Sequence, residues 1–141
     1  MGITPGPLSE LILDASAVVE AALLEHGFDI YEPHRLCAPG FLWWEVNSVL
    51  HEQSWRGDIS SEHVRASMAR FHRQSIQAFG PSAEFLEAAA RVSARLGWAK
   101  VYDSLYVALA LSLPGSRLVT RDERLQRGAA RIVEIISPAE L

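Results

Sequence analysis

A chain of 141 residues is long enough to bury a substantial core in one domain, and a composition of 49% hydrophobic and 21% charged residues excludes intrinsic disorder. The single cysteine, Cys37, excludes an intrachain disulfide and a zinc site built from thiolates. A net charge of −4 argues against nucleic-acid binding through an overall positive field, but every basic residue except Lys100 is an arginine, whose planar group binds phosphate at two points.

No apolar run approaches the roughly 20 residues that a membrane helix needs. Residues 1–10 contain no basic region ahead of an apolar stretch, which is the pattern of a secretion signal. We therefore expect a cytoplasmic protein.

Short apolar runs alternate with helical patterns along the chain. The run 11–13 predicts a buried strand that ends at Asp14, and Ser16 is expected to cap a helix over 17–24. Further strands are expected over 35–38, 75–79, 117–120 and 132–136. Further helices are expected over 41–55, 60–73, 82–96, 102–113 and 122–126. This alternation predicts a three-layer α/β fold with a mainly parallel sheet of about five strands, in a single domain over residues 1–141.

Two aspartates closely follow expected strands. Asp14 comes directly after the first strand, and Asp122 follows the strand 117–120 by two residues. Because open parallel sheets bind ligands at the carboxyl ends of their strands, both acids are expected at the same edge. Each has a structural alternative, since Asp14 favours a strand-to-helix turn and Asp122 fits the first turn of a helix capped by Thr120.

Two further acids lie in helices that are otherwise apolar. Glu45 falls within the stretch 41–46, where almost every neighbour is hydrophobic and a largely buried helix is expected. A carboxylate that loses its hydration there needs a cation, a hydrogen-bond partner or a shifted pKa. Asp103 stands in the first turn of the apolar helix 102–113. The alternatives are that Glu45 reaches solvent at the helix edge and that Asp103 is an ordinary first-turn acid.

Gathered at one place, these four carboxylates would repel one another and raise some of their pKa values. A hard divalent cation removes that conflict, because Mg²⁺ or Mn²⁺ takes oxygen ligands, keeps several waters and commonly binds through one or two carboxylates plus a substrate phosphate. Such an ion activates a water for attack on phosphorus and stabilises the departing oxygen. The four acids therefore predict phosphodiester hydrolysis.

Four stretches of the chain resemble, in order, the successive motifs of the PIN domain family, particularly the VapC-type toxin ribonucleases of bacterial type II toxin–antitoxin systems. The first is Leu-Ile-Leu-Asp-Ala-Ser at 11–16, and the second is Ala-Pro at 38–39 followed by Trp-Glu-Val at 44–46. The third and fourth are the runs 101–110 and 118–125. Each motif is common alone, but the four at these separations span nearly the whole chain.

The resemblance implies an endoribonuclease that depends on Mg²⁺ or Mn²⁺ and acts on structured RNA. It implies that Asp14 and Asp103 are the direct metal ligands. Glu45 and Asp122 would complete the acidic pocket by binding a second metal or positioning water. The resemblance also implies two partners, a VapB-like antitoxin that blocks the pocket and a second copy of the chain in a homodimer.

Other residues have weaker assignments. Ser16 and Thr120 match small hydroxyl positions that support such sites in the family. Arg121 and Arg124 lie beside the fourth acid, where they contact RNA phosphates or simply form a solvated helix face. The aromatic cluster 41–44 offers apolar surface for dimer or antitoxin contacts, but we expect it to be plain core.

Two rival functions come from other classes. A phosphotransfer domain would use Asp14 as a covalent nucleophile, but the phosphatases that do so need a second aspartate two residues later, where Ser16 stands. A non-catalytic RNA-binding or regulatory module would keep the fold without turnover, and acids at all four positions speak against it. Phosphoenzyme formation separates the first rival from a nuclease, and a cleavage assay separates the second.

Overall fold

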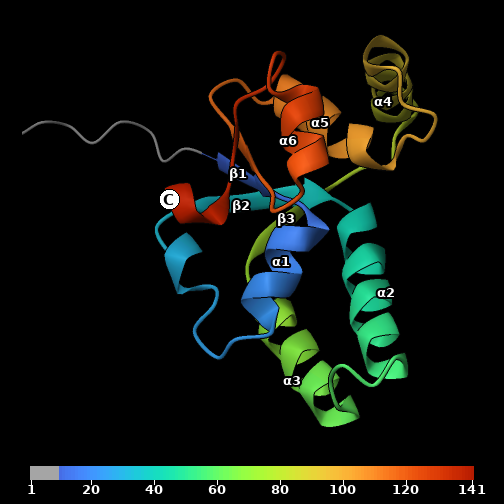
Figure 1. Ribbon diagram of the computed structural model, residues 1–141. Helices are drawn as coiled ribbons and strands as arrows, with labels where there is room; N and C mark the ends of the chain where they lie inside the picture. The colour runs from blue at the N-terminus through green and yellow to red at the C-terminus, as the bar shows by residue number, and fades with distance from the viewer. Residues whose placement is uncertain (1–9) are drawn as a thin grey trace, which may run out of the picture.

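The computed structural model describes residues 10–141, in which five strands alternate with six α-helices (Figure 1). The strands are β1 (Glu10–Leu13), β2 (Arg35–Pro39), β3 (Ile76–Phe79), β4 (Arg117–Val119) and β5 (Ile135–Ile136). The helices are α1 (Ala15–Ala22), α2 (Phe41–Trp55), α3 (Ser61–His72), α4 (Ala83–Leu96), α5 (Tyr102–Ser112) and α6 (Glu123–Ala129). Two short 3-10 helices are η1 (Asp29–Tyr31) and η2 (Pro138–Glu140). The expectation that the chain has no secretion signal concerns residues 1–10, and residues 1–9 lie outside the described part.

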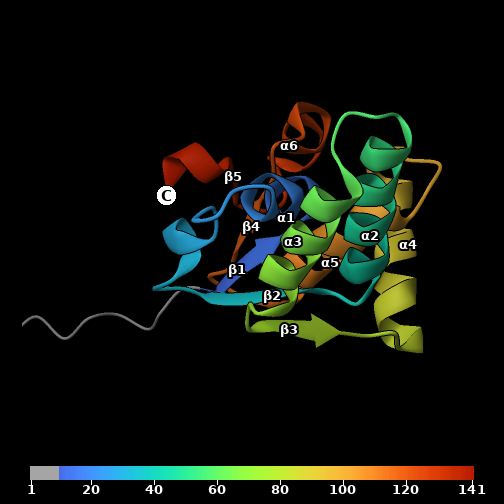
Figure 2. The same cartoon turned by 90° about the horizontal axis from the view of Figure 1, so that it is seen from below.

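All five strands form one parallel sheet in the order β3-β2-β1-β4-β5. β1 lies at the centre, with Leu11 opposite Leu36 of β2 on one side and opposite Arg117 of β4 on the other. In Figure 1, α1, α2 and α3 lie on one face of the sheet and α4, α5 and α6 on the other. Figure 2 shows α1, α2 and α3 grouped side by side, and they pack against one another. The predicted three-layer α/β fold with a parallel sheet is confirmed.

The centre of the sheet is buried on both faces, because β1 carries three consecutive large apolar side chains. Leu11, Ile12 and Leu13 are each 0% exposed, as expected for a strand covered by helices on both sides. α5 packs against β1, β2 and β4, and its residues 104–110 are all buried. α5 is therefore buried on several sides, which is typical of a helix that is apolar around most of its circumference. No helix within residues 10–141 is both long and apolar enough to cross a membrane.

Two helices begin differently from the sequence expectation. Asp14, rather than Ser16, is the N-cap of α1, because its carboxylate accepts a hydrogen bond from the backbone N–H of Ala17 at 3.0 Å. Asp122, rather than Thr120, caps α6 and accepts hydrogen bonds from two backbone N–H groups in the first turn. In both places the acid predicted for chemistry also holds a helix terminus, so its position is fixed by the fold.

The last strand, β5, is shorter than the expected stretch 132–136. The N–H groups of Ile132 and Val133 donate back to the carbonyl of Ala129, so this segment is a turn that follows α6. Its β-branched residues favour a strand, but the backbone hydrogen bonds at the end of α6 hold residues 132 and 133 in a turn instead.

α2 is less buried than expected. Leu42 and Val46 are 0% exposed, whereas Trp44 is 75% exposed. Phe41 and Trp43 are partly buried and pack against the core. The expectation that the cluster 41–44 is core is therefore wrong for Trp44, because consecutive helical residues point in different directions and only part of the cluster faces the sheet.

Candidate active site

Asp14 lies at the carboxyl end of the central strand, where it is only 6% exposed. Its Oδ1 accepts hydrogen bonds from the Ser16 hydroxyl at 2.6 Å and from the backbone of Ala17, and its Oδ2 accepts one from the hydroxyl of Thr120. Burial raises the pKa of Asp14, and the charge of Asp122 adds to this, while the three hydrogen bonds oppose it. Both carboxylate oxygens are therefore oriented by the protein.

The hydroxyls of Ser16 and Thr120 link the ends of β1 and β4. The backbone N–H of Asp14 donates to the carbonyl of Val119 at 3.2 Å, which continues the pairing of the two strands. Thr120 Oγ1 accepts from the backbone N–H of Asp122 at 2.9 Å and lies 3.3 Å from Ser16 Oγ. Two hydroxyls that the sequence places 104 residues apart thus meet at Asp14, where they hold its side chain.

Glu45 lies on α2 and has a partner that the sequence analysis did not identify. The hydroxyl of Tyr106 donates a hydrogen bond of 2.5 Å to Glu45 Oε1, and the Tyr106 side chain is only 1% exposed. Burial raises the pKa of Glu45, the hydrogen bond opposes this, and the charges of Asp103 and Asp14 add to it. The sequence contains a signal for such a contact, because a buried tyrosine needs a partner for its hydroxyl, but it does not indicate that this partner is Glu45.

Asp103 and Asp122 complete the acidic group from α5 and from the N-cap of α6. Asp103 is exposed, yet partial desolvation raises its pKa, the charge of Asp122 adds to this, and the charge of Arg124 opposes it. Asp122 is half-buried and uses Oδ1 to accept the N–H groups at the start of α6.

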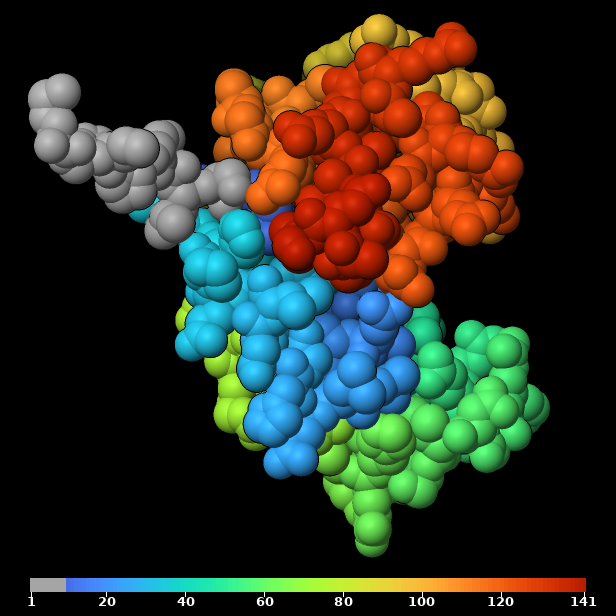
Figure 3. Space-filling view, turned by 60° about the vertical axis from the view of Figure 1, so that its left-hand side comes forward, coloured from blue at the N-terminus to red at the C-terminus, as the bar shows by residue number. Residues whose placement is uncertain are grey.

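One cavity of about 360 Å³ is lined by all four predicted acids, together with Ser16, Tyr106 and neighbouring side chains. The acids come from four separate elements that meet at the carboxyl edge of the sheet. Figure 3 shows the surface indented between orange residues of the α6 region and green residues of the α2 region. The structure therefore brings Asp14, Glu45, Asp103 and Asp122 together, as the sequence predicts.

The two arginines predicted near this site differ in their environments. Arg121 Nε lies 2.8 Å from Glu20 Oε2, so its charge is already paired. Arg124 lines a neighbouring cavity that also contains Glu45 and Asp103. Arg124 is therefore better placed than Arg121 to meet an anion that approaches the acids.

The donor set fits a hard divalent cation. Within residues 10–141, no group of three or more His, Cys, Asp or Glu side chains is arranged so that it could hold a metal ion. Mg²⁺ needs only one or two carboxylates, since waters and substrate oxygens complete its coordination. The cavity offers carboxylate oxygens, and burial, with a smaller contribution from the negative charges of the neighbouring acids, raises the pKa values of Asp14, Glu45 and Asp103. A bound cation would relieve that repulsion.

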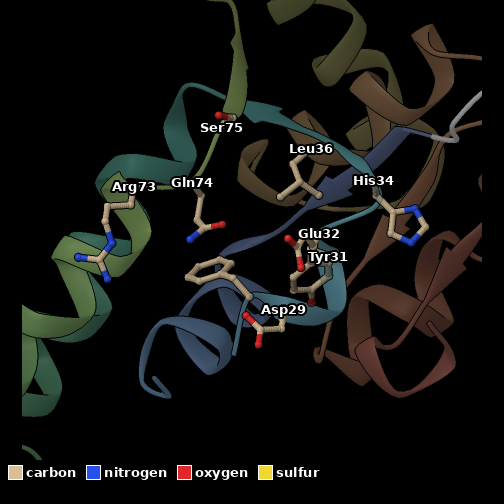
Figure 4. A pocket seen from close by; sticks show the side chains of 9 residues that line it. Asp29, Tyr31, Glu32, His34, Leu36, Arg73, Gln74 and Ser75 are labelled. Atoms are coloured by element: carbon tan, nitrogen blue, oxygen red, sulfur yellow. The ribbon is translucent and has the colours of Figure 1, made fainter. Parts of the chain in front are cut away.

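A second cavity, of about 350 Å³, lies between η1 and the end of α3, at the start of β2. None of the four predicted acids lines it. Figure 4 shows its charged side chains spread apart, with Arg73 and His34 on opposite sides. This polar hollow gathers no set of groups suited to a reaction, so the acidic cavity is the candidate active site.

Comparisons with known proteins agree with this architecture. The sequence profile described as the PIN domain matches residues 11–131. Among solved structures, the crystal structure of PAE2754 from Pyrobaculum aerophilum is similar with a TM-score of 0.69 and 24% identity, over 94% of this chain and 91% of that one, which shows the fold. A search of curated proteins finds no match. Because the profile spans most of the sequence and all four acids, the chain belongs to the PIN domain family, whose members are in general nucleases that hydrolyse phosphodiester bonds.

Proposed function

We propose that this protein is an endoribonuclease that depends on Mg²⁺ or Mn²⁺ and that Asp14, Glu45, Asp103 and Asp122 form its catalytic centre. The observation that carries this proposal is the single cavity lined by all four carboxylates, each delivered by a different element. Three of these groups have raised pKa values, which is typical of a site that holds charge for a function rather than for stability.

Asp14 and Asp103 are the proposed direct ligands of the ion. Asp14 is held by hydrogen bonds to both oxygens, so it reorganises little on binding. When bound, the cation supplies positive charge to a phosphate oxygen and lowers the pKa of a water. Glu45 Oε1 is occupied by Tyr106, so Oε2 is the atom proposed to accept the proton of the attacking water. Asp122 is proposed to position that water or a second ion.

Tyr106 is a positioning residue in this scheme, and we expect Tyr106→Phe to lower the rate of RNA cleavage about tenfold. The hydrogen bond from Tyr106 opposes the rise in the pKa of Glu45, so its loss raises that pKa further. The acid limb of the pH–rate profile should therefore move to higher pH, while the retained ring preserves packing. A profile of cleavage rate against pH measures this, and a profile that coincides with that of the wild type contradicts it.

The finer assignment is the toxin of a VapBC-type pair, acting on structured RNA as a cytoplasmic single-domain protein. The four motif runs support it. A VapB-like antitoxin that covers the acidic cavity and a homodimer of this chain are the proposed partners. Trp44, which is 75% exposed on the same helix as Glu45, is available to such a contact. Co-expression with the product of a small neighbouring reading frame, followed by co-purification and a cleavage assay, tests this assignment.

The test of the nuclease activity is incubation of the purified protein with total RNA in Mg²⁺ or Mn²⁺. We expect defined fragments that disappear when a chelator is added. RNA that is bound but stays intact with both metals would make the protein the non-catalytic module. Intact RNA together with a covalent phosphoenzyme on Asp14 would make it the phosphotransfer domain. Two of the three hydrogen bonds to Asp14 come from side chains that hold a carboxylate in place, which supports a ligand more than a nucleophile.

A further inference from the structure

A larger cavity adjoins the proposed active site. Its volume is about 620 Å³, and Glu45 and Asp103 line both it and the acidic cavity, so the two cavities are neighbours at those side chains. Its other walls come from the loop between α4 and α5, from the first residue of α5 and from the first turn of α6. These walls carry a different chemistry, because they include aromatic rings and two cations.

Tyr102 provides a flat platform on this wall. Its ring stacks on Phe41 with centroids 4.8 Å apart and an angle of 13° between the planes, yet half of the Tyr102 side chain is exposed. A ring supported on one face keeps its orientation when another planar group approaches from the cavity. Nucleobases stack on such rings with about 1–3 kcal/mol per base.

Trp98 adds a second aromatic side chain, from the loop between α4 and α5. It is partly buried against the core and lies directly over Gly128 of α6, where a Cβ would come within 2.7 Å of the indole Cζ2. The glycine lets the indole sit close to the helix backbone. This contact fixes the loop against α6. The cavity wall is therefore held at Trp98 by α6 and at Tyr102 by the stacked ring of Phe41.

Lys100 and Arg124 supply positive charge at the same cavity. Both side chains are exposed, and within residues 10–141 neither has a carboxylate at ion-pair distance. Arg121, by contrast, is paired with Glu20. Arg124 lies close enough to Asp103 for its charge to oppose the rise in the pKa of that carboxyl. Two cations without ion-pair partners beside a cluster of acids are well placed to hold the phosphates of a strand whose next linkage enters the acidic cavity.

We propose that this cavity is a substrate subsite that holds an unpaired nucleotide next to the cleaved linkage, with the base on Tyr102 and the flanking phosphates on Lys100 and Arg124. The inference rests on the proposed nuclease function and names the residues that hold the nucleotide beside the cleaved linkage. A base within a duplex is already stacked and paired, so its face is not available to the ring.

Binding of a fluorescein-labelled ten-nucleotide RNA without internal pairing tests this subsite. Anisotropy is measured with Ca²⁺ in place of Mg²⁺, to suppress turnover, at several salt concentrations. We expect Tyr102→Leu to weaken binding at least about fivefold and Tyr102→Phe to retain it, because the ring and not only its bulk is needed. Lys100→Gln and Arg124→Gln should each reduce the slope of log affinity against log salt by about 0.7.

Matched controls come from outside the cavity. Trp55→Leu removes an aromatic side chain that is 81% exposed at the end of α2, and Arg95→Gln removes an exposed arginine of α4. Both should bind the RNA like the wild type. Wild-type affinity of Tyr102→Leu, unchanged salt slopes in both cation variants, or equal affinity for a blunt duplex of the same sequence overturns the subsite.

Cleavage of the same RNA in Mg²⁺ by the wild type separates the two proposals. If the wild type cleaves and the variants bind unchanged, the subsite is wrong and the nuclease function stands. If the wild type leaves RNA intact although the variants lose affinity as expected, the nuclease function is wrong and the nucleotide subsite is supported.

Discussion

Asp14→Asn should lower the rate of Mg²⁺-dependent RNA cleavage at least about a hundredfold, as expected when a preorganised electrostatic group is removed from an active site. The carboxylate lies at the end of the central strand with both oxygens held by hydrogen bonds. Asparagine has nearly the same shape and caps helices as well as aspartate does, so α1 should still begin at the same place. The variant therefore removes charge with little change in fold. Initial rates on a labelled RNA, with circular dichroism to check folding, measure the effect.

The matched control is Asp29→Asn, because Asp29 is an exposed aspartate that lines the cavity between η1 and the end of α3, away from the four acids. It should cleave RNA at the wild-type rate. Cleavage by Asp14→Asn within about threefold of the wild type, in protein that is free of contaminating nuclease, would remove Asp14 from the catalytic centre.

Mg²⁺ should raise the melting temperature of the protein, and this increase should grow as the pH rises from 5 to 7.5. Burial and mutual repulsion raise the pKa values of Asp14, Glu45 and Asp103 above their usual 3.8 for aspartate and 4.5 for glutamate. Such groups hold protons more tightly in the folded state. Their contribution to stability is therefore fully present below the usual values and is lost as the pH rises through the raised ones. Mg²⁺ needs the ionised carboxylates, so it restores stability where the metal-free protein has lost it.

The expected size of this shift follows from mass action. At a Mg²⁺ concentration one hundred times the dissociation constant, binding stabilises the fold by about 2.7 kcal/mol, which corresponds to about 5–10 °C for a domain of this length. Differential scanning fluorimetry at pH 5 and 7.5, with Mg²⁺ or with chelator, measures it. Asp103→Asn serves as the control, because it should reduce the shift at both pH values. An equal shift at both pH values in the wild type would contradict the link to the carboxylates.

The sequence was sufficient to place the four acids because each is anchored to an element that the sequence also indicates. Asp14 and Asp122 follow parallel strands, and parallel strands end at the same edge of a sheet. Glu45 and Asp103 were singled out because apolar neighbours predict burial, although Asp103 is in fact exposed. The positions of the four acids were therefore predicted from the order of strands and helices along the chain rather than from any single motif.

Contacts between distant side chains could not be predicted in the same way. The hydrogen bond from Tyr106 to Glu45 joins residues 61 positions apart, and it depends on the relative rotation of α5 and α2. The exposure of Trp44 depends on which side of α2 faces the sheet, which a helix apolar on several sides does not specify. The cavity between Trp98 and Tyr102 depends on a loop conformation supported by Gly128. Each is a property of packing between elements.

The place of β1 in the sheet affects when the protein becomes active during its own synthesis. Leu11 pairs with Arg117, and the hydroxyl that holds Asp14 belongs to Thr120. The ribosome must therefore add roughly a hundred residues after β1 before β4, its second neighbour in the sheet, exists, which takes about 5–20 s at usual rates of translation. Until then the nascent chain has no complete acidic centre, so under the proposed ribonuclease function it would leave the messenger that encodes it uncut.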